Sequence, residues 1–200
     1  NAFVFCCFNQ NYKITPNIFN IWMKILKKIE GSVLWLIKDS NEGANNLKKE
    51  ANKRGINPDK IIFAKRMTIS EHLARHKMAD LFIDTFPYTA HTTCSDALWS
   101  GLPVITLMGQ SFASRVSGSL LNAIGLKELI TSTKKEYEDL IFELAKNPKK
   151  LKSIKSKLNK NKLTKPLFNT KLYTKKIEAS YIKAYKRYQS NLPLENIEIK

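Results

Sequence analysis

Short apolar runs alternate with amphipathic segments through the first two thirds of the chain, and this alternation constrains the fold most. The apolar runs have the character of buried strands, and they occupy residues 3–8, 32–37, 61–64, 81–84, 103–107 and 129–130. The segments between them carry apolar residues at helical spacing, within residues 16–29, 44–54, 71–78, 92–100 and 117–123. Strands and helices that alternate in this way form right-handed βαβ units. The sequence therefore predicts an α/β fold with a doubly wound, Rossmann-like parallel sheet.

The sequence changes character near residue 133, where helical, lysine-rich segments replace the alternation. Apolar residues at helical spacing recur within residues 137–144, 151–158 and 173–188. We therefore expect a Rossmann-like domain at residues 1–132 and a C-terminal helical tail at residues 133–200 that packs on it. The apolar content of 43% is enough for a substantial core. Three tryptophans lie on apolar faces and are expected in that core: Trp22, Trp35 and Trp99.

Polar loops follow the predicted strands, at the edge of the sheet where doubly wound folds bind their ligands. These loops are residues 9–13, 65–72, 85–93 and 109–115. The third loop leads into a helix that begins at His91-Thr92-Thr93. A helix N-terminus presents free N–H groups and the positive end of a dipole, which suit a phosphate. An ordinary N-cap uses the same residue types, so the residues alone leave a nucleotide site and a plain helix start both open.

Basic side chains of the predicted helix at residues 71–78 allow more than one interpretation. His72 and His76 have the i, i+4 spacing of metal ligands, but no Glu follows His72 as it does in zinc proteases. We therefore expect no metal site there. Arg75 can either reach a phosphate or pair with Glu71, one turn earlier on the same helix.

The formal net charge of +17 invites a nucleic-acid interpretation. The lysines, however, are spread over predicted helix faces, and their densest cluster, residues 146–165, lacks stacking aromatic residues. No recognised nucleic-acid motif is present. We therefore expect solvated helix faces and no specific nucleic-acid partner.

The cysteines and the apolar runs indicate a cellular setting. Cys6 and Cys7 are adjacent, which is poor disulfide geometry, and a total of three cysteines does not fit a disulfide framework. A reducing, cytoplasmic location is expected. No apolar run has the length of a membrane span. The chain begins with a strand-like segment at Asn1, so we expect it to be a fragment of a longer protein.

Six motifs together resemble the protein O-GlcNAc transferase family. In chain order they are F-N-Q-N-Y-K-I-T-P, G-S-V-L-W-L, E-H-L-A-R, H-T-T-C-S-D-A-L-W-S-G-L-P-V, F-A-S-R-V and P-L-F-N-T-K-L-Y. They cover nearly the whole chain, which looks most like the bacterial members that carry tetratricopeptide repeats upstream. The resemblance implies the C-terminal, nucleotide-sugar-binding half of a GT-B glycosyltransferase. The N-terminal catalytic half and the repeats would then be its partners within the protein.

The resemblance also implies a reaction. Family members are inverting enzymes that need no metal or other cofactor, and they transfer N-acetylglucosamine from UDP-GlcNAc to Ser or Thr hydroxyls of an acceptor protein. The implied contacts with the UDP-sugar are Gln10, Lys13, Met67, Thr68, Ile69, His72, Arg75, His91, Thr92, Thr93 and Asp96. Lys13 and His91 are the expected catalytic residues, because positive charge and donors at the diphosphate favour the departure of UDP. Asp96 would accept hydrogen bonds from the ribose, and residues 65–72 would hold the uracil edge.

Several alternatives stay open at this stage. Ile69 replaces a lysine of the animal enzymes, which weakens one nucleotide contact. The motif D-T-F-P-Y also resembles SPINDLY-type relatives that use GDP-fucose, and bacterial asparagine glucosyltransferases are more distant relatives. A non-catalytic, basic binding module on the same fold is the alternative from a different class. Without its N-terminal half, the chain is expected to catalyse nothing alone.

Overall fold

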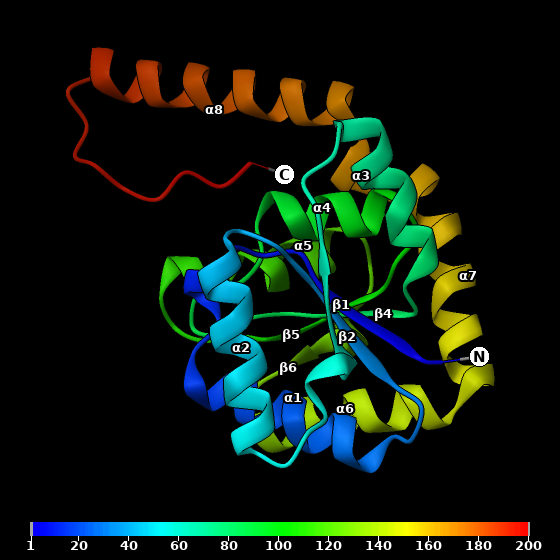
Figure 1. Cartoon of the computed structure of the whole chain (residues 1–200). Helices are drawn as coiled ribbons and strands as arrows, with labels where there is room; N and C mark the ends of the chain where they lie inside the picture. The colour runs from blue at the N-terminus through cyan, green and yellow to red at the C-terminus, as the bar shows by residue number, and fades with distance from the viewer. Residues whose placement is uncertain (1, 200) are drawn as a thin grey trace.

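A six-stranded parallel sheet lies at the centre of the molecule (Figure 1). The computed structural model describes residues 2–199. The strands are β1 (Val4–Cys7), β2 (Val33–Ile37), β3 (Ile61–Ala64), β4 (Leu81–Ile83), β5 (Val104–Leu107) and β6 (Ile130–Thr131). Their order in the sheet is β3-β2-β1-β4-β5-β6. This order confirms the predicted doubly wound, Rossmann-like fold, which runs outward from β1 in one direction and from β4 in the other.

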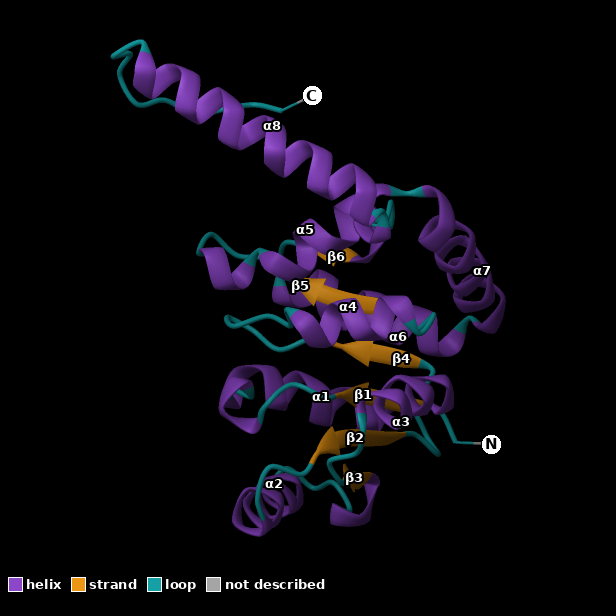
Figure 2. Ribbon diagram, turned by 90° about the horizontal axis from the view of Figure 1, so that it is seen from above, coloured by secondary structure: helices purple, strands orange, loops and turns teal. Residues whose placement is uncertain are grey.

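Helices cover both faces of this sheet (Figure 2). They are α1 (Pro16–Lys28), α2 (Asn41–Lys53), α3 (Ile69–Arg75), α4 (Thr92–Trp99), α5 (Val116–Ala123), α6 (Lys134–Lys146), α7 (Pro148–Thr164) and α8 (Thr170–Gln189). Short 3₁₀ turns lie in the segments that connect the strands and helices. They are η1 (Asn11–Lys13), η2 (Pro58–Lys60), η3 (His76–Met78), η4 (Phe112–Ser114), η5 (Lys127–Leu129) and η6 (Pro166–Phe168). α3, α4 and α5 lie on one face, whereas α1 and α6 lie on the other. The helix that follows β1 therefore lies on the opposite face of the sheet from the helix that follows β4.

Local sequence signals set the helix ends as expected. Thr15 caps α1 by accepting a hydrogen bond from the Ile18 N–H, and Pro16 occupies the first helical position. Gly101 follows α4 with a φ of +85°, a left-handed conformation that glycine adopts without steric cost. These two ends fix where α1 leaves the loop after β1 and where α4 returns to β5.

The core forms around β1 and β4. Phe5, Cys6 and Cys7 of β1 have no exposed surface, and neither do Leu81 and Phe82 of β4. Strands in the middle of a parallel sheet are covered on both faces, which explains why these runs are continuously apolar.

The three tryptophans differ from one another in their environment. Trp22 is fully buried, as predicted, whereas Trp35 of β2 is half-buried. The prediction that Trp99 is core is wrong, since 52% of it is exposed. Trp99 is the last residue of α4, where the helix leaves the sheet, and it packs edge-to-face against Phe168 of η6 with ring centres 5.1 Å apart.

The helical C-terminal part divides into packed and unpacked helices. α6 contacts β5, β6 and α1, and it buries Tyr137, Ile141 and Leu144. α7 contacts α4 and α6. By contrast, α8 buries none of its residues and extends away from the sheet (Figures 1 and 2). The domain boundary at residue 133 stays a prediction.

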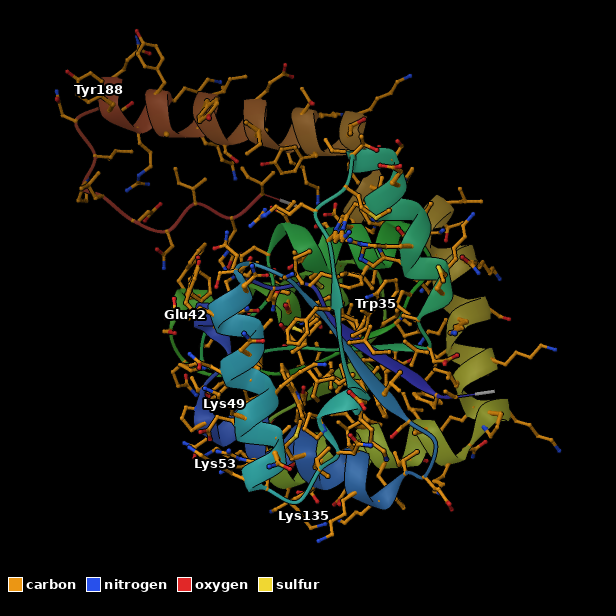
Figure 3. The ribbon with its side chains drawn as sticks, in the orientation of Figure 1. Trp35, Glu42, Lys49, Lys53, Lys135 and Tyr188 are labelled. Atoms are coloured by element: carbon orange, nitrogen blue, oxygen red, sulfur yellow. The ribbon has the colours of Figure 1, made fainter. Side chains whose placement is uncertain are left out.

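Much of the positive charge lies on the outer faces of the helices. Lys49 and Lys53 of α2 and Lys135 of α6 are exposed, and all three are labelled in Figure 3. None of the helices between residues 2 and 199 is long and apolar enough to cross a membrane.

Candidate functional site

The site is built where β1 and β4 lie side by side. The chain leaves β1 towards α1 on one face and leaves β4 towards α4 on the other. Such a switch in direction opens a crevice at the carboxyl ends of two neighbouring strands, and ligands of doubly wound folds bind there. The loop that contains η1 and the loop at residues 84–91 contact each other at this switch point, and we call the region between them the crevice.

Lys13 connects the two loops of the crevice. Its Nζ donates a hydrogen bond to the Thr89 carbonyl oxygen at 3.1 Å and lies 3.7 Å from the centre of the Tyr88 ring. The other side of the crevice holds His91, whose ring centre is 5.1 Å from that of Tyr88. Burial lowers the pKa of Lys13, and the nearby Asp84 carboxylate opposes this shift. The structure thus brings Lys13 and His91 to the same edge of the sheet, around one aromatic ring.

The N-terminus of α4 opens at the same edge. The N–H groups of Cys94 and Ser95 donate to the His91 carbonyl oxygen at 3.1 and 3.2 Å. The N–H groups of Thr92 and Thr93 come before these first helical bonds and are therefore directed out of the helix end. Thr92 is exposed, but the Thr93 hydroxyl already donates to the Asn9 side-chain oxygen. The helix start therefore offers backbone donors and the Thr92 hydroxyl to a ligand.

His91 itself precedes α4 and has one unsatisfied ring nitrogen. Its Nε2 is buried and has no hydrogen-bond partner among residues 2–199. Phe112 approaches the same ring edge-on, with ring centres 6.2 Å apart. Few buried polar atoms in folded proteins lack a partner, so this ring nitrogen is a candidate contact for a ligand oxygen.

A buried polar network holds the crevice in shape, and sequence reasoning did not find it. The Asp84 carboxylate accepts hydrogen bonds from the Thr85 N–H at 2.8 Å, the Ala90 N–H at 2.7 Å, Asn9 Nδ2 at 3.1 Å and Thr106 Oγ1 at 2.8 Å. Asp84 is completely buried, and burial raises the pKa of its carboxyl, whereas the donors Ser117, Thr106, Ala90 and Thr85 lower it. The only signal in the sequence is an acid that directly follows an apolar strand.

The network also extends to the far side of the sheet. The Tyr137 hydroxyl of α6 donates to the Asp84 carbonyl oxygen at 2.7 Å and accepts from Trp22 Nε1 of α1 at 3.1 Å. All three residues are fully buried. The loop after β4 is thus attached to helices that cover the opposite face.

A second cluster joins α3 to α4. His72 Nε2 lies 3.7 Å from an Asp96 carboxylate oxygen, and Arg75 donates to His72 Nδ1. Burial, with a smaller effect of the Arg75 charge, lowers the pKa of His72, whereas burial raises the pKa of Asp96. Residues 2–199 contain no group of three His, Cys, Asp or Glu side chains that could hold a metal ion.

The remaining predicted contacts are exposed. Gln10 precedes η1 without capping it, and Met67 and Ile69 expose 52% and 80% of their surface. Thr68 forms a capping box with Glu71, so its hydroxyl serves the start of α3. The contact of these residues with a ligand stays a prediction, as does that of the other residues named from the sequence.

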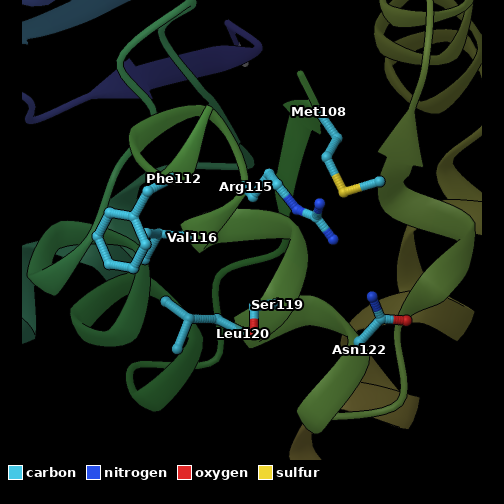
Figure 4. A pocket seen from close by; sticks show the side chains of 7 residues that line it. All are labelled: Met108, Phe112, Arg115, Val116, Ser119, Leu120 and Asn122. Carbon is cyan, nitrogen blue, oxygen red and sulfur yellow. The ribbon is translucent and has the colours of Figure 1, made fainter. Parts of the chain in front are cut away.

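An apolar groove adjoins the crevice at the end of β5 (Figure 4). Its volume is about 540 Å³. It is lined by Met108, Phe112, Arg115, Val116, Ser119, Leu120 and Asn122. Phe112, which is 82% exposed, lies between this groove and His91. The loop at residues 109–115 thus lies at the edge of the sheet where it was expected.

The comparison with known families agrees with the fold and the crevice. The family model Glycosyl transferase family 41 matches residues 1–177. The chain belongs to this family. The resemblance seen in the six motifs is thereby confirmed, and the chain is part of a family of glycosyltransferases.

The family 41 chain is similar to two curated relatives over nearly its whole length. It is 39% identical over 200 residues to the Arabidopsis thaliana protein named "Probable UDP-N-acetylglucosamine--peptide N-acetylglucosaminyltransferase SEC". It is 36% identical over 197 residues to the UDP-N-acetylglucosamine--peptide N-acetylglucosaminyltransferase of Caenorhabditis elegans. These matches cover 100% and 98% of this chain but only 20% and 17% of the relatives.

A solved structure also resembles the family 41 chain. A mutant of the Thermobaculum terrenum O-GlcNAc transferase superimposes with a TM-score of 0.79 and 30% identity, over 86% of this chain and 35% of that one. This likeness confirms the prediction that the sheet belongs to one half of a GT-B glycosyltransferase fold.

Proposed function

We propose that this chain is the donor-binding half of a protein O-GlcNAc transferase. The complete enzyme would transfer N-acetylglucosamine from UDP-GlcNAc to a Ser or Thr hydroxyl of an acceptor protein. The observation that carries this proposal is that the Lys13 ammonium group and the open N-terminus of α4 lie at the same edge of the sheet, at its switch point. A full positive charge and free N–H donors at one point suit the diphosphate of a nucleotide-sugar. The names of the relatives support the same donor.

The proposed reaction is an inverting displacement that needs no metal. The acceptor oxygen forms a bond to the anomeric carbon as the bond from that carbon to the diphosphate oxygen breaks, and UDP leaves. The hydroxyl proton passes to a base in the N-terminal half of the enzyme. Negative charge grows on the β-phosphate during this step, and Lys13, the α4 N-terminus and the His91 ring stabilise it.

The other polar groups of the crevice would orient the nucleoside. Asp96 and His72 lie where α3 faces α4, and they would bind a ribose hydroxyl. The exposed loop at residues 65–69 would contact the uracil edge. Two partners in the same protein complete the proposal: the N-terminal catalytic half and tetratricopeptide repeats that bind the acceptor. A cytoplasmic location is proposed because all three cysteines are free and buried.

Titration calorimetry with UDP, GDP and a random single-stranded oligonucleotide tests this proposal. We expect UDP to bind most tightly, and Lys13→Met to weaken it. The matched control is Lys49→Met, an exposed lysine on α2, which should bind UDP normally. Preference for GDP would instead support O-fucosyl transfer, and preference for the oligonucleotide would support a basic binding module. Mass spectrometry of acceptor peptides treated with the full-length enzyme would separate Ser or Thr modification from asparagine glucosylation.

A further inference from the structure

Arg75 is nearly buried, and two of the three nitrogens of its guanidinium group bond within the protein. Only 6% of the residue is exposed. One terminal nitrogen, Nη1, donates to the Lys65 carbonyl oxygen at 2.7 Å, and the other, Nη2, donates to His72 Nδ1. Cζ of the guanidinium group lies over the Phe8 ring, 4.5 Å from its centre. The third nitrogen, Nε, is buried and has no hydrogen-bond partner among residues 2–199. The two hydrogen bonds and the Phe8 contact hold the Arg75 side chain beside the His72 ring.

The contact with Arg75 determines which ring nitrogen of His72 carries a proton. A guanidinium group only donates hydrogen bonds and stays protonated in proteins. His72 Nδ1 must therefore accept, so a neutral His72 carries its proton on Nε2. The groups that face the ring favour the neutral form: the Arg75 charge, the Phe8 ring at 5.6 Å and the His76 ring at 4.8 Å between centres. Among residues 2–199, Asp96 is the one acid within 4 Å of this ring.

The proton on Nε2 is directed at the Asp96 side of the crevice. Nε2 and the Asp96 oxygen are 3.7 Å apart, which is too long for a hydrogen bond between them. The side chains of His72 and Asp96 are 19% and 30% exposed, so a ligand can reach both. Together they present one donor and one acceptor, and a single hydroxyl can accept from the first while it donates to the second.

We propose that Arg75 is a positioning residue that fixes the Nε2–H tautomer of His72, so that His72 and Asp96 together recognise one ribose hydroxyl of the nucleotide. This inference deepens the proposed function and rests on it for the identity of the ligand. Arg75 also holds the Lys65 carbonyl oxygen, and so the start of the loop proposed to contact the base. Arg75 therefore supports two parts of the proposed nucleoside site, the His72 ring and the start of the loop at residues 65–69.

The tautomer can be read directly from ¹⁵N chemical shifts of the His72 ring in the chain without ligand. The signals are assigned by their loss in His72→Gln. We expect Nδ1 of the wild type to be the unprotonated nitrogen. Arg75→Met should introduce the Nδ1–H form and raise the pKa of His72, because a positive neighbour is lost. Arg75→Lys, which keeps a charged donor, should restore the wild-type pattern, and Lys77→Met, an exposed cation on η3, should leave it unchanged.

The ligand part of the proposal needs a separate measurement. UDP, 2′-deoxy-UDP and 3′-deoxy-UDP are titrated against the wild type and the same variants. We expect loss of one of the two hydroxyls to weaken wild-type binding about fivefold, the effect of about one hydrogen bond. Arg75→Met should bind UDP and that deoxy analogue with nearly equal affinity, and Arg75→Lys should discriminate as the wild type does.

Each negative result contradicts a different statement. A wild-type His72 protonated on Nδ1 would overturn the positioning role of Arg75, and this measurement needs only the wild-type chain. Unchanged ring shifts in a folded Arg75→Met would overturn it as well. If the wild type binds UDP and both deoxy analogues equally, the hydroxyl recognition is wrong. Absence of UDP binding in the wild type would contradict the proposed function, while the tautomer result would still decide the role of Arg75.

Discussion

The Lys13 ammonium group donates a hydrogen bond to the Thr89 carbonyl oxygen at 3.1 Å, across the crevice between the loops after β1 and β4. This bond, together with the contact of Nζ with the Tyr88 ring, holds a flexible side chain in one place. An ammonium group has three donors, and the carbonyl uses one of them. Lys13 is therefore placed in advance for a ligand at the switch point, with donors to spare.

The first prediction concerns the catalytic role of Lys13. In the proposed reaction, its interaction with the departing diphosphate would strengthen as charge builds, so it would favour the transition state over bound substrate. In the full-length enzyme, Lys13→Ala should lower kcat about a hundredfold, or about 3 kcal/mol, and change the donor KM less. Steady-state kinetics with UDP-GlcNAc measure both constants. Lys49→Ala is the control, and a normal kcat with only KM altered would mean that Lys13 merely holds the donor.

The second prediction concerns the attachment of α6 to the site. Tyr137→Phe removes the hydrogen bond to the Asp84 carbonyl oxygen and leaves the buried Trp22 N–H without an acceptor. We expect a loss of about 1–3 kcal/mol in the free energy of unfolding, measured by urea denaturation. Tyr181→Phe on α8, where the side chain is 70% exposed, should cost almost nothing. Equal stability of the two variants would show that the Tyr137 hydroxyl is not important for folding.

The third prediction follows from His76, which is completely buried. Burial lowers the pKa of His76 to about 4, below its ordinary value of 6.5. The unfolded chain therefore binds a proton more readily between pH 6.5 and pH 4, and stability falls as the pH falls through this window. His76 alone should reduce the free energy of unfolding by roughly 2 kcal/mol between pH 7 and pH 5.

Urea denaturation at both pH values measures this effect. His76→Gln removes the titrating ring but keeps a side-chain N–H for the His72 carbonyl oxygen, which His76 Nδ1 contacts at 2.8 Å. The variant should lose less stability than the wild type on acidification. His72 contributes a dependence of the same sign in both proteins, because its pKa is also lowered. If the two proteins lose stability equally, the proton uptake takes place elsewhere.

The sheet was accessible to sequence reasoning because its signals are local. The strands are buried on both faces, so each reads as an apolar run whatever its neighbours are. The start of α1 is likewise predicted by two adjacent residues, the N-cap Thr15 and Pro16 at the first helical position. The alternation of these elements then fixes the topology, and the topology places Lys13 and His91 at one edge.

The supports of the site were not accessible, because they join residues that are far apart in the chain. The hydrogen bond between Asn9 and Asp84 joins residues 75 positions apart in the sequence, and that between Tyr137 and Asp84 joins residues 53 positions apart. No spacing rule relates such positions. Arg75 illustrates the same limit. From the sequence, its expected partner was either a phosphate or Glu71. In the structure, Glu71 instead accepts a hydrogen bond from the Thr68 N–H, and Arg75 donates to the Lys65 carbonyl oxygen. Burial of a charged side chain depends on the whole fold and not on its neighbours in sequence.

The last prediction concerns α8, which carries apolar and aromatic side chains but buries none of its residues. Tyr173, Tyr181, Tyr185 and Tyr188 are each more than 60% exposed. A helix without tertiary packing opens easily, since most helical stability in proteins comes from packing. Amide hydrogen exchange within residues 173–188 of this chain should therefore be much faster than in α6, whose Tyr137, Ile141 and Leu144 are buried.

The same measurement on the full-length protein tests where α8 packs. We expect α8 to lie against the N-terminal half, as the last helix of GT-B enzymes often does, so its exchange should slow in the longer protein. α6 serves as the internal control, because its contacts with β5, β6 and α1 are already complete in this chain. Strong protection of α8 in the chain alone would show instead that the helix docks on the sheet domain.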